Sequence, residues 1–223
     1  LIGWAAIGYL LLIVAFSLPT ARMRSHLEST PGTFSNGSVV LVKDDTSTHL
    51  DYLTEATILS EAIYDGDESA FTKAAAIYSI IPPSDETLNW SYAKLTAALS
   101  SNRDAAYGAY ARYWQGQNAI LRPLLLLFDY KDILRLNMLV QLGLMLWIAY
   151  LLPRRQLGYL LLPFVILFGA LTPAATSLCL QYTPCFLIMA GGCAFLLCYP
   201  DAVKKHPWLF FLSLGMATSY LGF

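Results

Sequence analysis

Two acidic side chains and two arginines have the types and spacing for chemistry at a membrane surface. Asp51 and Glu55 are four positions apart, so a helix would place both carboxylates on one face. Arg112 and Arg122 bracket an aromatic segment, and guanidinium groups bind phosphate oxygens bidentately. A carboxylate near such cations is suited to deprotonating a hydroxyl acceptor while a phosphate departs. This chemistry would make Asp51 the base, with Glu55 assisting and Arg112 or Arg122 holding phosphate.

The same residues also have an ordinary structural interpretation. Asp51 and Glu55 can be solvated helix charges or caps, and aromatic residues such as Tyr113 and Trp114 gather at membrane interfaces without any ligand. Further acidic residues are read as ordinary surface charges, namely Glu61, Asp65, Asp67 and Glu68. No metal site is expected, because the four cysteines are irregularly spaced and have no nearby histidine or carboxylate.

The composition indicates a membrane protein. Hydrophobic residues make up 57% of the chain, charged residues only 13%, and the mean hydropathy is +0.52. A soluble domain carries about 25% charged residues. The net charge of −1 also argues against nucleic-acid binding, because no basic surface is available to neutralise phosphates.

Apolar runs separate the chain into four regions. We expect a first transmembrane helix over 1–18, an extracytoplasmic helical loop over 19–118, and an interfacial or re-entrant helix over 119–130. Residues 131–223 should form a transmembrane bundle of about four spans, the last incomplete. The first of these spans is expected over 133–152, and a turn is expected around 172–174. The predicted fold class is therefore all-α: a polytopic bundle with an extracytoplasmic insertion of short amphipathic helices. Both ends fall inside apolar segments, so the chain is read as part of a longer protein.

Basic pairs predict the orientation. Arg154 with Arg155, and Lys204 with Lys205, each follow an apolar segment and should be cytoplasmic under the positive-inside bias. The loop over 19–118 would then be outside. Isolated polar residues within lipid usually face the bundle or a watered cavity. Arg135 and Gln181 both belong to the outer side, which favours a role for them in binding substrate.

The insertion is read as a set of four short helices rather than a strand-rich domain, with an extended piece over 39–42. The expected positions are from Thr46 onward, from Asp67 or Glu68 to Tyr78, from Ser91 through Leu99, and from Asn102 or Asp104 through Trp114. Thr46 or Ser47 is the expected cap of the first of these helices. In the fourth, the aromatic residues from Tyr107 to Trp114 fall at offsets of three, six and seven, which would give them one shared face.

One block of the chain resembles a family of largely uncharacterised bacterial polytopic membrane proteins. In that family a Tyr-x-Arg-Tyr-Trp-His-Gly segment precedes a Leu-Arg-Pro-Leu-Leu run. The matching residues here are Tyr110 to Gly116, Leu121 to Leu125, Asp129, Tyr130, Ile133, and Leu180 to Tyr182. The chain departs from the pattern at Gln115, where the family has histidine. The resemblance extends from about Asp51 to the end of the chain.

The layout of that family is similar to GT-C membrane glycosyltransferases, which use polyprenyl-phosphate sugar donors. The resemblance implies a transferase acting on lipid-linked sugar at the outer face of the cytoplasmic membrane, in cell-envelope glycan assembly. The substrate-binding residues would be Arg112, Tyr113, Trp114, Arg122, Arg135 and Gln181. Membrane lipids and the lipid-linked sugar are the expected partners, and no cofactor is indicated. The alternatives are a transporter or flippase of lipid-linked or small polar cargo, and a non-catalytic membrane scaffold.

Overall fold

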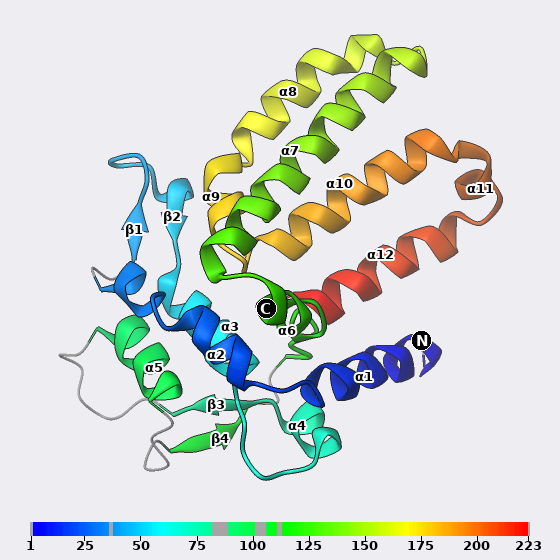
Figure 1. The fold of residues 1–223 in the computed structure, drawn as a ribbon. Helices are drawn as coiled ribbons and strands as arrows, with labels where there is room; N and C mark the ends of the chain where they lie inside the picture. Colours follow the sequence, from blue (N-terminus) through cyan, green and yellow to red (C-terminus); the bar gives the residue numbers. More distant parts are fainter. Residues whose placement is uncertain (1, 36–37, 82–88, 101–105, 111–112, 223) are drawn as a thin grey trace.

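Helices dominate the computed structural model, which describes residues 2–35, 38–81, 89–100, 106–110 and 113–222. Long apolar helices project to one side of the molecule, and a smaller region of short helices and strands lies on the other (Figure 1). The apolar helices are α1 (Ile2–Phe16), α7 (Tyr130–Arg154), α8 (Leu161–Ala170), α10 (Thr183–Cys198) and α12 (Pro207–Leu221).

Within the described residues, α7 is the one helix that is long and apolar enough to cross a membrane by itself. It has 25 residues, and the predicted span over 133–152 lies inside it. Asp132 in its first turn and Arg154 in its last complement the helix dipole. Helix α1 passes the same test only together with α2 (Ala21–Leu27), to which it is bent by 82°. Helix length alone gives weak support for membrane association.

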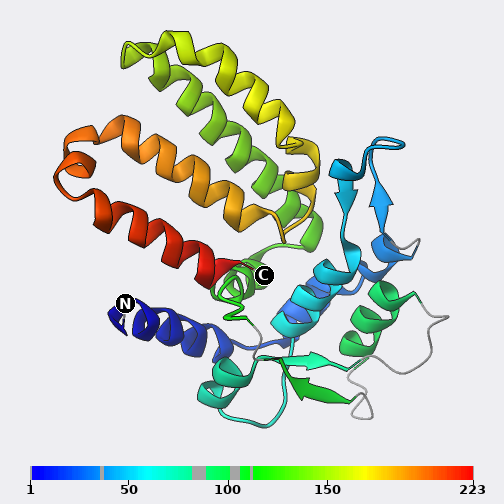
Figure 2. The same cartoon turned by 180° about the vertical axis from the view of Figure 1, so that it is seen from behind.

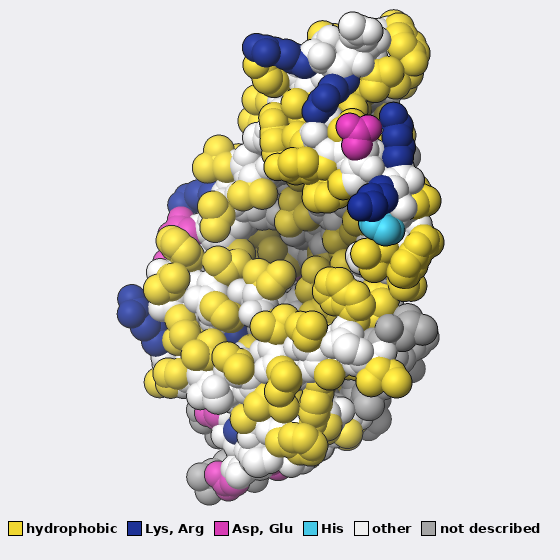
Figure 3. Space-filling model, turned by 90° about the vertical axis from the view of Figure 1, so that its right-hand side faces the viewer, with side chains coloured by type: hydrophobic (Ala, Val, Ile, Leu, Met, Phe, Trp, Pro, Cys, Tyr) yellow, Lys and Arg dark blue, Asp and Glu magenta, His cyan; other side chains and the backbone are white. Residues whose placement is uncertain are grey.

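The outer faces of the apolar helices are themselves apolar. Leu162 on α8 is 69% exposed, Leu139 on α7 62%, and Trp208 on α12 66%. Figure 3 shows a face dominated by hydrophobic side chains, with Lys and Arg gathered toward its upper end. Soluble monomers rarely expose contiguous apolar patches of this kind. The helices thus present a surface suited to lipid.

The apolar helices fold back on one another. Helix α7 packs against α10 through a core that includes Met145, Ile148, Phe186 and Ala190. The predicted turn near Thr172 is confirmed: this residue has φ of +46° and precedes α9 (Pro173–Leu178). At the opposite end, Arg155 donates a 2.7 Å hydrogen bond to the carbonyl of Cys198. The end of α7 that carries Arg154 and Arg155 therefore lies beside the end of α10, and the second basic pair, Lys204 and Lys205, follows in α11 (Pro200–Lys205).

The smaller region contains two short antiparallel strand pairs in addition to helices (Figure 2). In one pair Val39 lies opposite Leu50, and in the other Tyr78 lies opposite Ala109. The elements are η1 (Pro31–Phe34), β1 (Val39–Val40), η2 (Thr46–Thr48), β2 (His49–Leu50), α3 (Tyr52–Ala62), α4 (Ala70–Ala76), β3 (Tyr78–Ile80), α5 (Trp90–Leu99) and β4 (Tyr107–Ala109). Helix α3 is central because it packs against α5, β3 and α6 (Asn118–Leu127).

The expected helix from Asn102 or Asp104 through Trp114 is wrong. Residues 107–109 form β4, and the backbone of Ile80 pairs with that of Tyr107. The Tyr107 ring packs on Tyr64, with ring centroids 4.9 Å apart. Aromatic residues suit a half-buried strand as well as a helix face, and here the partner strand decided between them. Residues 101–105 and 111–112 lie outside the described chain.

Two other helices begin or end differently from the predictions. The second is shorter, because α4 runs only from Ala70 to Ala76 and is followed by Ile77 at φ +43°. The first begins at Tyr52, after η2 and β2, and neither Thr46 nor Ser47 caps it. The helix from Ser91 to Leu99 is confirmed as α5. The short helix expected near 119–128 is present as α6.

Candidate functional site

The carboxylate of Glu55 is buried where three elements meet. Glu55 lies on α3 and has no exposed surface. The Tyr130 hydroxyl at the start of α7 donates to its Oε2 at 2.7 Å. The Gln181 backbone N–H, between α9 and α10, donates to Oε1 at 2.9 Å, and the Cys179 thiol donates at 3.4 Å. The carboxylate therefore joins the insertion directly to the apolar helices.

Burial raises the pKa of Glu55 to about 7, and the hydrogen bonds from Tyr130, Gln181 and Cys179 only partly oppose this. Desolvation disfavours the charged form, whereas hydrogen bonds donated to a carboxylate favour it. A carboxyl group with such a pKa can take up or release a proton near neutral pH. Glu55 thus has the protonation behaviour of an acid–base residue, although its position is enclosed.

Asp51, the expected base, caps helix α3. Its Oδ1 accepts a 3.1 Å hydrogen bond from the Thr54 backbone N–H, and its Oδ2 accepts a 2.6 Å bond from the Thr54 hydroxyl. This is the geometry of an N-cap, so the structural interpretation of Asp51 holds. The side chain remains half-buried rather than enclosed. A catalytic role for Asp51 stays a prediction.

The two described arginines among the expected substrate ligands have different environments. Arg122 is 1% exposed, and its guanidinium donates to the carbonyls of Ala15 at 2.8 Å, Leu18 at 3.1 Å, and Ala62. Arg122 therefore joins α6 to the ends of α1 and α3, and its guanidinium is not placed to hold a substrate phosphate as expected. Arg135 is exposed and pairs with Asp132 at 2.6 Å, three residues away. Arg135 thus remains accessible to a ligand.

The aromatic candidates lie at the surface beside the last helix. Tyr113 is 36% exposed and Trp114 44%. The Trp114 ring packs edge-on against Tyr220 of α12, with centroids 6.1 Å apart. Arg112 lies outside the described residues. Of the four residues expected to bind substrate together, the structure describes Tyr113, Trp114 and Arg122. Arg122 is buried, whereas the two aromatic side chains are partly exposed.

Glu61 was expected to be a surface charge, and this is wrong. It is fully buried on α3, and neither carboxylate oxygen has a hydrogen-bond partner among the described residues. Burial raises the pKa of Glu61 to about 8, although the positive charge of Lys94 opposes the shift. Lys94 itself donates to the Thr57 hydroxyl at 3.0 Å. The insertion thus holds a second buried carboxyl group, six positions after Glu55 on α3.

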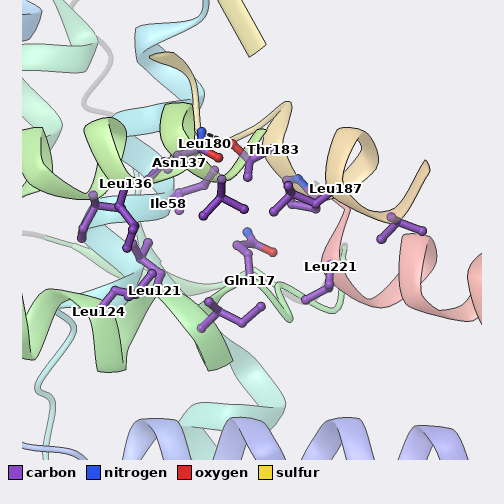
Figure 4. A pocket seen from close by; sticks show the side chains of 15 residues that line it. Ile58, Gln117, Leu121, Leu124, Leu136, Asn137, Leu180, Thr183, Leu187 and Leu221 are labelled. Carbon is purple, nitrogen blue, oxygen red and sulfur yellow. Dashed lines mark hydrogen bonds between the residues drawn. The ribbon is translucent and has the colours of Figure 1, made fainter. Parts of the chain in front are cut away.

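An apolar pocket lies between the apolar helices and the insertion (Figure 4). Its volume is about 400 Å³, which is within the range of about 300–1,000 Å³ found for small-molecule sites. Residues of α3, α6, α7, α10 and α12 contribute to its lining. The polar lining side chains are Gln117, Asn137 and Thr183. The pocket is suited to an apolar chain with few polar groups.

The residues that contact the Glu55 carboxylate, together with Glu55 itself, form a cluster next to the pocket lining; we call it the Glu55 cluster. Ile58, Ile133 and Leu180 line the pocket. Ile58 is three positions after Glu55, Ile133 three after Tyr130, and Leu180 directly precedes Gln181. These spacings place each lining residue about one helical turn or one residue from a member of the cluster. The pocket lining and the contacts of the Glu55 carboxylate therefore draw on the same three segments of the chain.

Sequence reasoning paired Glu55 with Asp51 and overlooked Tyr130, Cys179 and Gln117. The available signal was the resemblance, whose matching block includes Asp129 with Tyr130 and Leu180 with Gln181. Gln181 was expected to act through its side chain, but its backbone N–H makes the contact. Among the described residues, no group of three or more His, Cys, Asp or Glu side chains is placed to hold a metal ion.

Comparison of the chain with family models, curated proteins and solved structures found no match.

Proposed function

We propose that this chain is a multi-span membrane protein with its insertion at the outer surface of the cytoplasmic membrane. Three features support this proposal: the exposed apolar faces of α7, α8 and α12, the basic pairs at one end of these helices, and the insertion at the other. Lys and Arg near span ends favour the cytoplasmic side. Residues 19–118 would then face outward.

Within that membrane, we propose a transferase that uses a lipid-linked sugar, in cell-envelope glycan assembly. The observation that carries this proposal is that the apolar pocket and the contacts of the Glu55 carboxylate draw on the same three segments of the chain. The pocket suits the lipid chain of a substrate, and a carboxyl group with a pKa near neutrality suits proton transfer. The pocket and the carboxyl group both lie at the junction of the insertion and the apolar helices, where a lipid-linked sugar would be presented.

The proposed reaction needs one base and one leaving group. The acceptor hydroxyl attacks the anomeric carbon of the sugar, the bond from that carbon to the phosphate oxygen breaks, and the lipid phosphate departs. The hydroxyl proton passes to a carboxylate. In this proposal Asp51 receives the proton because its side chain is half-buried and reachable, while Glu55 assists from within the protein. Arg135, which is exposed, would be available to the phosphate.

The direct test is sugar transfer in proteoliposomes. The full chain is supplied with a polyprenyl phosphate that carries a radiolabelled hexose, and label in an acceptor is measured. Asp51→Asn keeps the helix cap and removes the charge, so transfer should fall about 100-fold or more while the fold persists. Glu28→Gln makes the same chemical change at an exposed carboxylate and should leave transfer unchanged. Undiminished transfer in an Asp51→Asn, Glu55→Gln double variant would remove both residues from the proposal.

The orientation has its own test. Asp67→Cys in the insertion and Lys204→Cys in α11 are both exposed positions, on the two opposite sides in this proposal. A membrane-impermeant maleimide added to intact cells should label the first variant and reach the second only after permeabilisation. The reverse pattern would place the insertion in the cytoplasm and refute the proposed site.

A carrier for lipid-linked cargo is a second candidate, favoured by the break between α1 and α2. The apolar helix α1 and the basic helix α2 are bent by 82°, and discontinuous helices are typical of transporter sites. A carrier would move a fluorescent lipid-linked sugar between leaflets without any acceptor. Movement of this kind, with no transfer in the radiolabel assay, would favour the carrier over the transferase.

A further inference from the structure

The pocket contains one polar atom that the protein leaves without a partner. Gln117, just before α6, is 9% exposed, and its side chain enters the middle of the pocket (Figure 4). Its Nε2 donates a hydrogen bond to Oε1 of Gln115, whereas its own Oε1 has no partner among the described residues. A buried acceptor without a partner costs about 1–3 kcal/mol. An atom of this kind, placed within a cavity, points to a ligand.

The other polar groups of the pocket are already used. Asn137 Nδ2 donates to the Thr183 hydroxyl at 2.8 Å and to the Ser177 carbonyl at 2.9 Å. Its Oδ1 accepts a 3.1 Å hydrogen bond from Gln141. These bonds hold α7 against α9 and α10. Gln117 is therefore the polar lining side chain, within the described part of the protein, that is available to bind a ligand.

The backbone around Gln117 is fixed before any ligand arrives. Gln115 adopts a left-handed conformation with φ of +53° and is completely buried. The next residue, Gly116, donates a 3.0 Å hydrogen bond from its backbone N–H to the carbonyl of Tyr220 on α12. A side chain at position 116 would overlap that carbonyl oxygen, so the close approach needs glycine. The Gln115–Gln117 amide pair is thus held rigidly at the pocket.

We propose that the pocket binds a lipid with a hydroxyl-bearing head, whose hydroxyl donates to Gln117 Oε1 and whose chain lies along the apolar lining. An unpartnered acceptor calls for a hydrogen-bond donor. A hydroxyl of the sugar in a lipid-linked sugar can supply it, whereas a fully ionised phosphate presents only acceptor oxygens and cannot. The occupant is a lipid because α7 and α12, which line the pocket, also expose apolar faces suited to lipid. This inference deepens the proposed function, on which it rests for the location of the site in the membrane.

The test is a binding titration with three probes that share one chain: oleyl alcohol, oleyl methyl ether and oleyl phosphate. Each is titrated against the purified full chain in detergent by native mass spectrometry. One hydrogen bond to a buried acceptor should make oleyl alcohol bind about fivefold tighter than the ether. Oleyl phosphate should bind more weakly than the alcohol. Val140→Trp, which fills the pocket lining, should weaken binding of all three probes.

Two variants isolate the acceptor. Gln117→Leu should abolish the preference for the alcohol over the ether. It removes an unpartnered acceptor but also the donor to Gln115 Oε1, so the two effects oppose each other and the thermal unfolding midpoint should change little. Gln117→Met makes the same chemical change with a more adaptable side chain and should give the same loss, should the leucine variant not fold. Asn118→Leu replaces the neighbouring buried amide, which does not line the pocket, and should retain the preference.

Equal binding of alcohol and ether by the unaltered chain, or tighter binding of the phosphate, would overturn this inference. A preference that persists in Gln117→Leu would do the same. The assay contains no sugar donor, so its outcome is separate from that of the transfer assay. Asp51→Asn should bind oleyl alcohol normally, and absence of sugar transfer would then refute the reaction while the lipid site remained.

Discussion

The backbone N–H of Gln181 donates a 2.9 Å hydrogen bond to the buried carboxylate of Glu55, across 126 positions of the chain. Together with the 2.7 Å hydrogen bond from Tyr130, this contact joins α3 to the start of α7 and to the segment before α10. The insertion and the apolar helices are therefore held together through a titratable group, and the predictions below follow from such contacts.

Protonation of Glu55 should make stability depend on pH. Its carboxyl has a pKa of about 7 in the fold against an ordinary value of 4.5. Between these values the folded chain holds a proton that the unfolded chain has released, so stability falls as pH rises from about 4.5 to 7. The contribution lost is roughly 3 kcal/mol. Thermal unfolding in detergent from pH 5 to 8 should show this slope, and Glu55→Gln should flatten it.

A separate variant distinguishes Glu55 from the other buried carboxyl group. The pKa of Glu61 is raised by burial to about 8, so its stabilising contribution is lost between about pH 4.5 and 8. Glu61→Gln should remove the decline between pH 7 and 8 and leave below pH 7 only the smaller slope that Glu55 contributes. An identical pH profile for Glu55→Gln and the unaltered chain would contradict the assignment.

Substitution of the two described arginines that were predicted to bind substrate should lower the stability of the fold by very different amounts. Arg122→Met leaves the carbonyls of Ala15, Leu18 and Ala62 without their donor, so we expect a loss of about 3 kcal/mol or more. Arg135→Met removes an exposed pair with Asp132 and should cost less than about 1 kcal/mol. Thermal unfolding of both variants in one detergent measures the contrast. Equal losses would mean that Arg122 does not hold α1 and α3 to α6.

Gly116 should tolerate no side chain. A methyl group there would overlap the carbonyl oxygen of Tyr220, so Gly116→Ala should destabilise the fold by about 1–3 kcal/mol. Gly215 in α12 has no neighbour within 4 Å of an added methyl group, so Gly215→Ala should be neutral or stabilise by up to about 1 kcal/mol. The unfolding midpoints of the two variants provide the comparison. A neutral Gly116→Ala would show that α12 does not approach this segment closely.

Two variants distinguish the role of Asp51 as a helix cap from a role of its charge in sugar transfer. Asp51→Ala removes the acceptor for the Thr54 N–H and should cost about 1 kcal/mol, whereas Asp51→Asn keeps an acceptor and should cost little. Circular dichroism melts measure this difference. If both variants lose sugar transfer but only the alanine variant loses stability, the charge of Asp51 has a role beyond the cap. Loss of transfer in the alanine variant alone would assign Asp51 to structure.

The sequence by itself determined the distribution of polarity and most of the helices. The apolar run over 133–152, with Arg135 as its one charge, predicted a helix long enough to cross a membrane, as α7 is. The short helix before it and the turn at Thr172 followed from local signals as well. Hydrophobic run length, proline position and helix capping act over a few residues, so one sequence is enough to read them.

Only the tertiary structure decided which side chains meet. Tyr107 lies in a strand because Ile80 pairs with it, and Arg122 is buried because the carbonyl ends of α1 and α3 converge on it. Glu55 is joined to Tyr130 and Gln181, which lie 75 and 126 positions away. Hydrogen bonds at such separations depend on how helices pack, and no local pattern in the chain records them.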